Sequence, residues 1–339
     1  LCDDYTLTVA SGTTLENRYL KASVNTMVGG CIDSVNLKNK KTNLTMPNSI
    51  NSAGGLAVDI IPGNKYPGVC RSSKYDYLVI EPKRKIKVWT TAPAPVKGLL
   101  VEKVFSLKDN SQKIDVAVTF TNKSAKEMQF LYRVQNIVPL EKGVFTWPTN
   151  DWLKAYKQTL SKMTSLSGTT TNTLKRGWMA KSNDDNKYSN IFIFDLNTTS
   201  QAYNYFGEQF DTAEWFYNKI SLAPGKKWSC KYALAFIENI GEVFYCDRNI
   251  VFGINRAKNG NSGAVNAGLL EGTTKGEFKV NGNNVAADLT TGRTVSIKGV
   301  KTPVRANFDS LKATLDTARY KTEYIKPVKL PAPPSLSSL

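Results

Sequence analysis

The amino acid that most restricts the chemistry of this chain is one it lacks, because none of its 339 residues is histidine. Without imidazole there is no Ser-His-Asp triad, no Cys-His pair and no His-ligated zinc or iron site. Proton transfer near neutral pH therefore falls to carboxylates, Lys, Tyr or Cys with displaced pKa values. The five cysteines follow no CxxC spacing, so we expect no metal site and no cofactor.

Polar side chains recur at regular spacing in the strand-like segment 129–136. Strand alternation places Arg133 and Gln135 on one face and Tyr132 and Val134 on the other. Guanidinium stays protonated and an amide does not titrate, so this face donates hydrogen bonds but supplies no proton near pH 7. The segment therefore predicts ligand binding, with Asn136 as a further polar candidate.

Aromatic residues offer apolar surfaces on which a sugar ring can stack while polar neighbours bind its hydroxyls. The candidates all lie between residues 147 and 215: Trp147, Trp152, Trp178, Tyr203, Tyr205 and Trp215. Trp147 and Trp152 are favoured because 147–152 resembles a loop that enters a helix. Asp151 in that loop either binds ligand or stabilises the first helical turn through the helix dipole. The alternative for each Trp is a place in the core.

Period-two alternation predicts an all-β fold. Residues 99–107 and 114–121 alternate on either side of a hairpin connection at 108–111, and 228–236 alternate after the turn at Pro224-Gly225. Cys230 in the last of these strands is predicted to be a core thiol. One segment differs, because Trp152, Tyr156, Leu160 and Met163 have helical spacing behind the capping residues Thr149 and Asn150, which predicts a helix over 150–163.

Four short motifs carry a resemblance to a known family. They are the glycine turn and strand at 28–35, the hairpin from 104–107 to 114–121 with its Asn122-Lys123-Ser124 end, the strand at 128–139, and Leu222-Ala223-Pro224-Gly225-Lys226-Lys227-Trp228. In this order they resemble the galactose mutarotase-like superfamily, also called aldose epimerase-like. The resemblance implies a large antiparallel β supersandwich.

In catalytic members of that superfamily, a histidine acts as general acid and a glutamate as general base to open and reclose the sugar ring. The strand that bears the histidine corresponds to 128–139, where this chain has Arg133 and Gln135. Glu208 is the closest positional match to the glutamate and the best catalytic candidate, and Glu214, beside Trp215, is the second. Without the histidine, mutarotase chemistry of the usual kind is not expected, and either glutamate is better suited to accept hydrogen bonds from sugar hydroxyls.

The composition changes after about Asp247, where aromatics become rare and Gly, Asn, Thr and Lys dominate. We expect the supersandwich to span residues 1–247, a small immunoglobulin-like β sandwich to span 248–325, and a Pro-rich tail to form 326–339. Asn281-Gly282 predicts a tight hairpin turn within the small sandwich.

Lys and Arg outnumber Asp and Glu by 45 to 28, a formal charge of +17 that attracts polyanions. Nucleic-acid-binding motifs and apolar stretches of membrane-spanning length are both lacking, so neither partner is expected. The first hypothesis is an exported carbohydrate-recognition protein, with a preference for acidic glycans. The alternative is a lyase-type enzyme on acidic polysaccharide that uses Tyr or Lys with Arg133, and a structural or protein-binding module is the third class. The sequence leaves the oligomeric state and the disulfide pairing open.

The chain begins at Leu1 rather than Met, which leaves open whether Leu1 follows a removed signal peptide, and export is expected on the assumption that it does. This places the protein in the periplasm or outside the cell. A lipoprotein anchor at Cys2 is disfavoured, because Leu1 is bulkier than the small residue that usually precedes such a cysteine.

Overall fold

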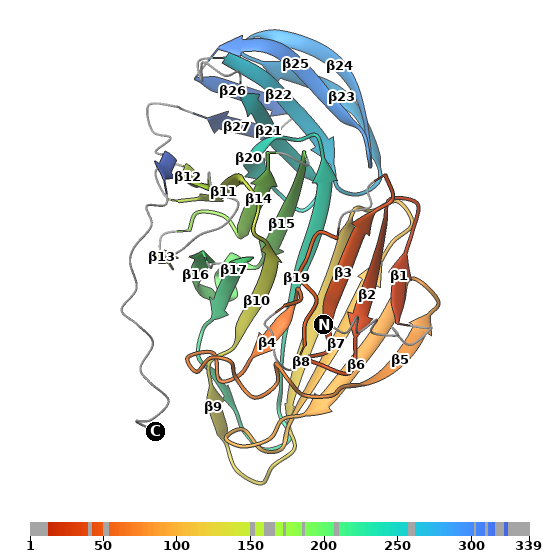
Figure 1. Cartoon of the computed structure of the whole chain (residues 1–339), viewed down its shortest axis with the longest axis vertical. Helices are drawn as coiled ribbons and strands as arrows, with labels where there is room; N and C mark the ends of the chain where they lie inside the picture. Colours follow the sequence, from red (N-terminus) through yellow and green to blue (C-terminus); the bar gives the residue numbers. More distant parts are fainter. Residues whose placement is uncertain are drawn as a thin grey trace, which may run out of the picture.

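The computed structural model describes residues 13–39, 43–49, 54–149, 153–158, 167–171, 174–184, 187–206, 210–256, 262–301, 303–308, 311–315 and 322–324. Most of these residues are in β-strands, which group into six sheets (Figure 1). A 3-10 turn, η1 (Leu196–Thr198), is the helical element among them. The predicted all-β fold is confirmed.

The largest sheet has ten strands in the order β28-β12-β11-β14-β15-β19-β8-β7-β6-β5. It contains the predicted hairpin, since β7 and β8 pair antiparallel from Leu99↔Asn122 to Leu107↔Ile114. Its strands are β5 (Asp76–Glu81), β6 (Lys85–Thr91), β7 (Leu99–Leu107), β8 (Lys113–Asn122), β11 (Gly143–Pro148), β12 (Leu153–Gln158), β14 (Trp178–Asn183), β15 (Tyr188–Phe194), β19 (Lys227–Glu238) and β28 (Thr322–Tyr324).

Smaller sheets cover the inner face of this large sheet. The five-stranded sheet β13-β16-β17-β10-β4 lies across its middle and the three-stranded sheet β1-β2-β3 lies over β5 to β8, while β9 and β18 form a two-stranded ribbon (Figure 1). The strands are β1 (Thr14–Glu16), β2 (Leu20–Asn25), β3 (Cys31–Leu37), β4 (Val58–Ile60), β9 (Met128–Phe130), β10 (Arg133–Pro139), β13 (Ser167–Thr171), β16 (Thr199–Phe206), β17 (Phe210–Tyr217) and β18 (Ile220–Leu222).

The main hydrophobic core fills the space between these layers. Phe120 of β8, Tyr132 before β10 and Tyr217 of β17 meet there, with the two tyrosine rings stacked 5.1 Å apart. Alternate residues of each strand supply this core, as period-two spacing requires. Cys230 lies in it at 7% exposure, which confirms the predicted core thiol.

A second sandwich is formed by the chain from Glu242 to Leu315. Its sheets are β20-β21-β22-β25 and β24-β23-β26-β27, and they enclose their own hydrophobic cluster, in which Phe252 stacks on Phe278. Asn281 and Gly282 adopt positive φ between β23 and β24, so the predicted hairpin turn is confirmed. The strands are β20 (Glu242–Cys246), β21 (Ile250–Arg256), β22 (Ser262–Leu269), β23 (Thr273–Val280), β24 (Asn283–Thr290), β25 (Thr294–Lys301), β26 (Val304–Phe308) and β27 (Leu311–Leu315).

The boundary expected after residue 247 stays a prediction, although β20 lies before it and belongs to this second sandwich.

The two parts of the chain share an apolar contact. Trp178, Ile191 and Ala235 on the outer face of the large sheet pack with Val243 and Val251 of the second sandwich. Trp178, a predicted ligand-stacking residue, is thereby only 2% exposed.

The predicted helix over 150–163 is wrong where the structure describes it. Residues 153–158 form β12, which pairs antiparallel with β11 and parallel with β28. Ala155 is fully buried, and Leu153 packs against the cluster inside the second sandwich and against the cluster shared with the large sheet, so these two alternate residues face the protein interior. Pairing with strands distant in sequence overrides the local helical spacing. Residues 150–152 and 159–163 lie outside the described part of the chain.

A buried ion pair links the layers. Lys103 Nζ of β7 lies 2.8 Å from Asp59 Oδ2 of β4, and both side chains are fully buried. Tyr132 donates a hydrogen bond to Asp59 Oδ1 at 2.8 Å, and Tyr75 donates one to Oδ2 at 3.1 Å. Burial, and next the charge of Asp59, raise the pKa of both tyrosines well above its usual value, so both remain donors.

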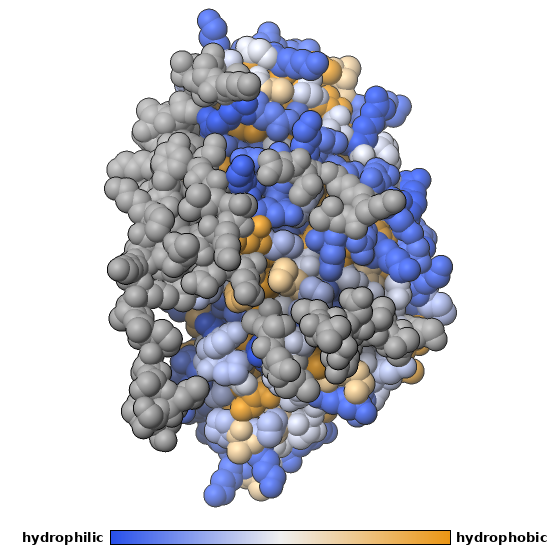
Figure 2. All heavy atoms as spheres, viewed as in Figure 1, coloured by the Kyte–Doolittle hydropathy of each residue, from blue (hydrophilic) through white to orange (hydrophobic). Residues whose placement is uncertain are grey.

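The surface seen in Figure 2 is mainly hydrophilic where its residues are described, with apolar residues in small separate patches. Such scattered apolar residues are ordinary on a folded domain. Within the described ranges, no helix is long and apolar enough to cross a membrane.

Removal of Asp59 should strongly destabilise the fold. Asp59→Ala leaves the Lys103 ammonium in the core without a counterion, and we expect the free energy of unfolding to fall by about 3–5 kcal/mol. Urea denaturation measures this. The control is Asp109→Ala, which removes an exposed partner of Arg84 and should cost less than about 1 kcal/mol. Equal losses in the two variants would show that the buried pair has no special role.

Candidate functional site

Strands β10 and β17 pair so that polar residues from each meet on one face. Arg133 lies opposite Phe216 and Gln135 opposite Glu214 in an antiparallel register. Since successive residues of a strand point to opposite faces, Arg133, Gln135, Thr212 and Glu214 share the outer face of the five-stranded sheet. The neighbouring Val134 and Trp215 face the core.

These four polar residues contact one another and form what we call the Arg133–Glu214 cluster. Arg133 Nη1 lies 3.3 Å from Glu214 Oε2. Gln135 Nε2 and Thr212 Oγ1 donate hydrogen bonds to Glu214 Oε1, at 3.1 and 2.7 Å. Glu214 is therefore the centre of the cluster, and its three partners orient its carboxylate.

Aromatic rings hold the guanidinium of Arg133 in place. Its central carbon lies 5.1 Å from the ring centroid of Phe216 and 5.7 Å from that of Tyr66, distances typical of cation–π contacts. Tyr66 is 55% exposed and marks the solvent side of the cluster. Tyr203 of β16 lies opposite Glu214 in the ladder and adds a half-buried phenol.

Four buried polar atoms of the cluster have no hydrogen-bond partner among the described residues. They are Arg133 Nε and Nη2, which are donors, and Gln135 Oε1 and Glu214 Oε2, which are acceptors. More than nine in ten buried polar groups in native proteins have a hydrogen-bond partner, so four atoms without one in a single cluster call for an explanation. Donors next to acceptors match hydroxyl groups, which accept and donate at once.

Burial controls the protonation of this cluster. Desolvation raises the pKa of Glu214 above its ordinary value of 4.5, although Arg133, Gln135 and Thr212 act in the opposite direction. Burial, and then the charge of Glu214, also raise the pKa of Tyr203, while Arg133 lowers it. A raised tyrosine pKa disfavours the phenolate that a lyase base would require.

The structure separates the other predicted site residues from this cluster. Asn136 points to the opposite side of β10, where its amide donates to Ala213 O and accepts from Ala57 N. Trp215 is fully buried and stacks on Phe194, and Trp147 is 1% exposed in the main core. The structure places these three side chains in internal packing and backbone hydrogen bonds away from the cluster, and their contact with a ligand stays a prediction. Asp151, Trp152 and Glu208 lie outside the described residues.

Sequence reasoning missed Thr212, Phe216 and Tyr66. Thr212 and Phe216 flank Glu214 at a spacing of two, so alternation could have placed them on its face. Tyr66 lies 67 residues before Arg133 in the chain, and no local pattern links the two. In the described part of the chain, no group of three or more His, Cys, Asp or Glu side chains is arranged to hold a metal ion.

Comparison with known proteins identifies the fold. No family model and no curated protein matches the sequence. Among solved structures, a protein of Escherichia coli K12 that has been proposed to be an aldose 1-epimerase is 13% identical, with a TM-score of 0.52 over 67% of this chain and 99% of its own. A galactose mutarotase-like protein from Lactobacillus casei is also 13% identical, with a TM-score of 0.50 over 66% and 99%.

The chain has the galactose mutarotase-like fold. The same fold occurs within a larger protein, because a TPR-domain containing protein from Parabacteroides distasonis matches at a TM-score of 0.54 and 12% identity. That match covers 66% of this chain and 46% of the other, so this chain spans about half of that protein's length. At such low identities, the comparisons establish a shared architecture and leave function to the residues themselves.

The raised pKa of Glu214 predicts a pH-dependent stability. The folded state favours the protonated carboxyl, so the contribution of Glu214 should fall as pH rises from about 4.5 through the higher folded-state pKa, and then level off. Unfolding free energies of the wild type and Glu214→Gln, measured from pH 4 to 8, test this. The free energy of unfolding of the wild type minus that of the variant should decrease as pH rises between the unfolded-state and folded-state pKa values of Glu214. An increase would mean that the ion pair with Arg133 outweighs desolvation. The exposed Glu81→Gln change serves as control.

Proposed function

We propose that this protein recognises carbohydrate at the Arg133–Glu214 cluster and does not catalyse mutarotation of the usual kind. The observation that carries the proposal is the set of four buried atoms without a hydrogen bond, two donors and two acceptors, within one cluster. A ligand with adjacent hydroxyls would satisfy all four. The fold shared with mutarotase-like proteins supports a sugar as that ligand.

The charge balance within the cluster favours a neutral sugar. Arg133 is already 3.3 Å from Glu214, so its positive charge is largely compensated before any ligand binds. A uronate carboxylate would have to approach Glu214 as well as Arg133, and like charges repel in a buried site. We therefore assign neutral hydroxyl recognition to this cluster. An acidic-glycan preference requires a different surface.

Ring contacts suit the same ligand. Tyr66 on the exposed side and the half-buried Tyr203 flank the cluster, and aromatic rings are suited to packing against the C–H groups of a pyranose. Arg133 is positioned between Tyr66 and Phe216, so it needs little reorganisation to bind.

Sugar binding should depend on the residues of the cluster. We expect Glu214→Ala and Arg133→Ala each to weaken binding of a neutral sugar, first identified on a glycan array, by about tenfold or more, because each removes a charged hydrogen-bonding group. Isothermal titration calorimetry measures the affinities. The exposed Glu127→Ala is the control and should bind as the wild type does. The proposal fails if no neutral glycan binds, or if both cluster variants retain wild-type affinity.

Catalysis is tested separately by polarimetry of freshly dissolved α-D-glucose and α-D-galactose. We expect the rate of mutarotation at neutral pH to match that in buffer, because Arg133 and Gln135 cannot transfer a proton to the sugar. Acceleration that is lost in Glu214→Gln would contradict the non-catalytic assignment and make Glu214 a base.

A further inference from the structure

A basic groove lies on the outer face of the ten-stranded sheet, which is the face turned away from the main core. Its volume is about 620 Å³, and it runs over the outer face of β6, β7, β8 and β19 as far as the turn between β20 and β21. Val104, Ala117 and Ala233 are among the small or apolar residues that line it. Among the described residues, five basic side chains line it against one carboxylate, Asp115.

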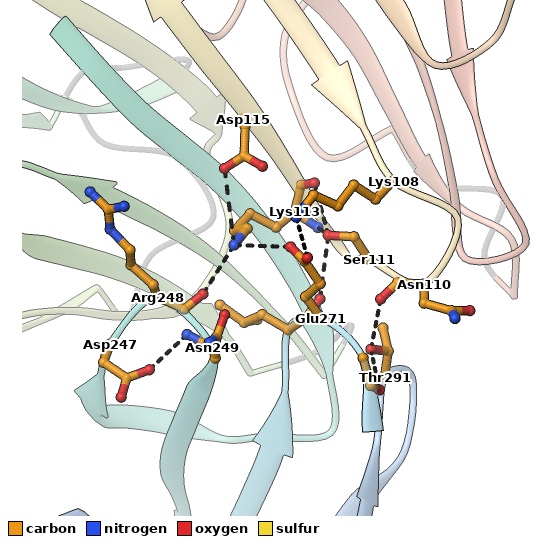
Figure 3. A network of polar contacts seen from close by, with 12 residues as sticks. Lys108, Asn110, Ser111, Lys113, Asp115, Asp247, Arg248, Asn249, Glu271 and Thr291 are labelled. Atoms are coloured by element: carbon orange, nitrogen blue, oxygen red, sulfur yellow. Dashed lines mark hydrogen bonds and ion pairs between the residues drawn. The ribbon is translucent and has the colours of Figure 1, made fainter. Parts of the chain in front are cut away.

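Two of the five basic groups are already neutralised where the groove meets the second sandwich. Lys113 Nζ lies 3.2 Å from Glu271 Oε2 and 4.0 Å from Asp115 Oδ1, and it donates to the backbone oxygen of Arg248. Lys108 Nζ binds Glu271 Oε1 at 2.5 Å. Figure 3 shows this network, in which the guanidinium of Arg248 extends away and takes no part.

The other three basic groups carry free charge. Lys85, Lys231 and Arg248 are exposed, and none of them forms a salt bridge within the described chain. Unpaired cations around a concave surface concentrate the positive potential there, and they attract anions more strongly than the same charges on a convex surface.

The spacing of these cations fits a chain rather than a single small anion. Lys231 of β19 lies beside Ala117 of β8, which pairs with Val104 of β7, and Lys85 lies on β6. Three inter-strand steps lead from Lys231 to Lys87, and Lys85 lies two residues further along β6, so the backbones of Lys231 and Lys85 are roughly 16 Å apart. One small anion cannot contact both, whereas consecutive charges along an extended polymer can.

The uncharged residues of the groove favour an acidic polysaccharide over single-stranded nucleic acid. Single-stranded nucleic acid is usually bound by aromatic rings on which its bases stack. Here the aromatic residues of the groove, Phe194 and Tyr232, are 6% and 4% exposed and face the core. The short side chains of Val104 and Ala117 instead allow the C–H faces of sugar rings to approach closely.

We propose that this groove binds an acidic polysaccharide chain, with Lys85, Lys231 and Arg248 contacting successive carboxylates or sulfates along it. The site is distinct from the Arg133–Glu214 cluster, which lies on the five-stranded sheet on the other side of the core. The two sites bind different groups, because the cluster recognises uncharged hydroxyls and the groove binds the charged chain.

The test compares two triple variants with the same net charge. Lys85→Ala, Lys231→Ala and Arg248→Ala together remove the free cations of the groove. Lys97→Ala, Lys123→Ala and Lys226→Ala remove three exposed lysines from turns outside it. Binding of fluorescently labelled polygalacturonate oligomers is followed by anisotropy. We expect about tenfold weaker binding for the groove variant, from the loss of three exposed ion pairs, and near wild-type binding for the control.

A second measurement requires no variant. Bound polygalacturonate should protect Lys85 and Lys231, but not Lys97 and Lys123, from acetylation detected by mass spectrometry. Equal affinity of the two triple variants, or uniform protection, would overturn the proposal. Tighter, groove-dependent binding of single-stranded oligothymidylate would assign the groove to nucleic acid instead. Glu214→Ala should leave polygalacturonate binding unchanged, so failure here is separate from failure of the neutral-sugar site.

Discussion

The ion pair between Lys103 and Asp59 fixes the arrangement on which the candidate site depends. Burial of two charges is costly, and the cost is recovered only when the partners meet in good geometry. Asp59 lies opposite Val134 in the β4–β10 ladder. A one-residue slip of β4 would turn Asp59 to the outer face and leave Lys103 uncompensated in the core. The pair therefore strongly favours the register in which Arg133 and Gln135 are presented outward.

Alternate residues from Tyr132 through β10 lie on opposite faces of the five-stranded sheet and make contacts on both. On the inner side, Tyr132 donates to Asp59 and stacks on Tyr217. On the outer side, Arg133 and Gln135 reach Glu214. The side-chain polar atoms of Asp59, Lys103 and Tyr132 on the inner side all have partners, whereas four atoms of the outer cluster lack a hydrogen bond. This asymmetry is what separates a structural polar network from one that is available to a ligand.

Alternation in the sequence predicted much of this arrangement and could have predicted more. It correctly placed Arg133 and Gln135 together, with Tyr132 and Val134 turned away. Applied to β17, the same rule shows that Glu214 and Trp215 cannot both face the site, so the burial of Trp215 was predictable. The strand at 153–158 was not, because its partners β11 and β28 are specified by contacts distant in sequence. The contact of Tyr66 with Arg133 could not be predicted for the same reason, because the two residues are distant in sequence.

The distribution of charge explains how one molecule of net charge +17 can offer two different surfaces. Three cations of low exposure each have an anion as partner: Lys103 pairs with Asp59, Lys181 with Asp211, and Arg133 with Glu214. Charges that are paired and buried give directional hydrogen bonds with little long-range field. The excess of Lys and Arg must therefore lie at the surface, where a field can attract a polyanion over roughly 8–10 Å at moderate salt. A neutral sugar gains nothing from that field and needs the fixed geometry of the cluster, so the two kinds of recognition are best located on different sheets.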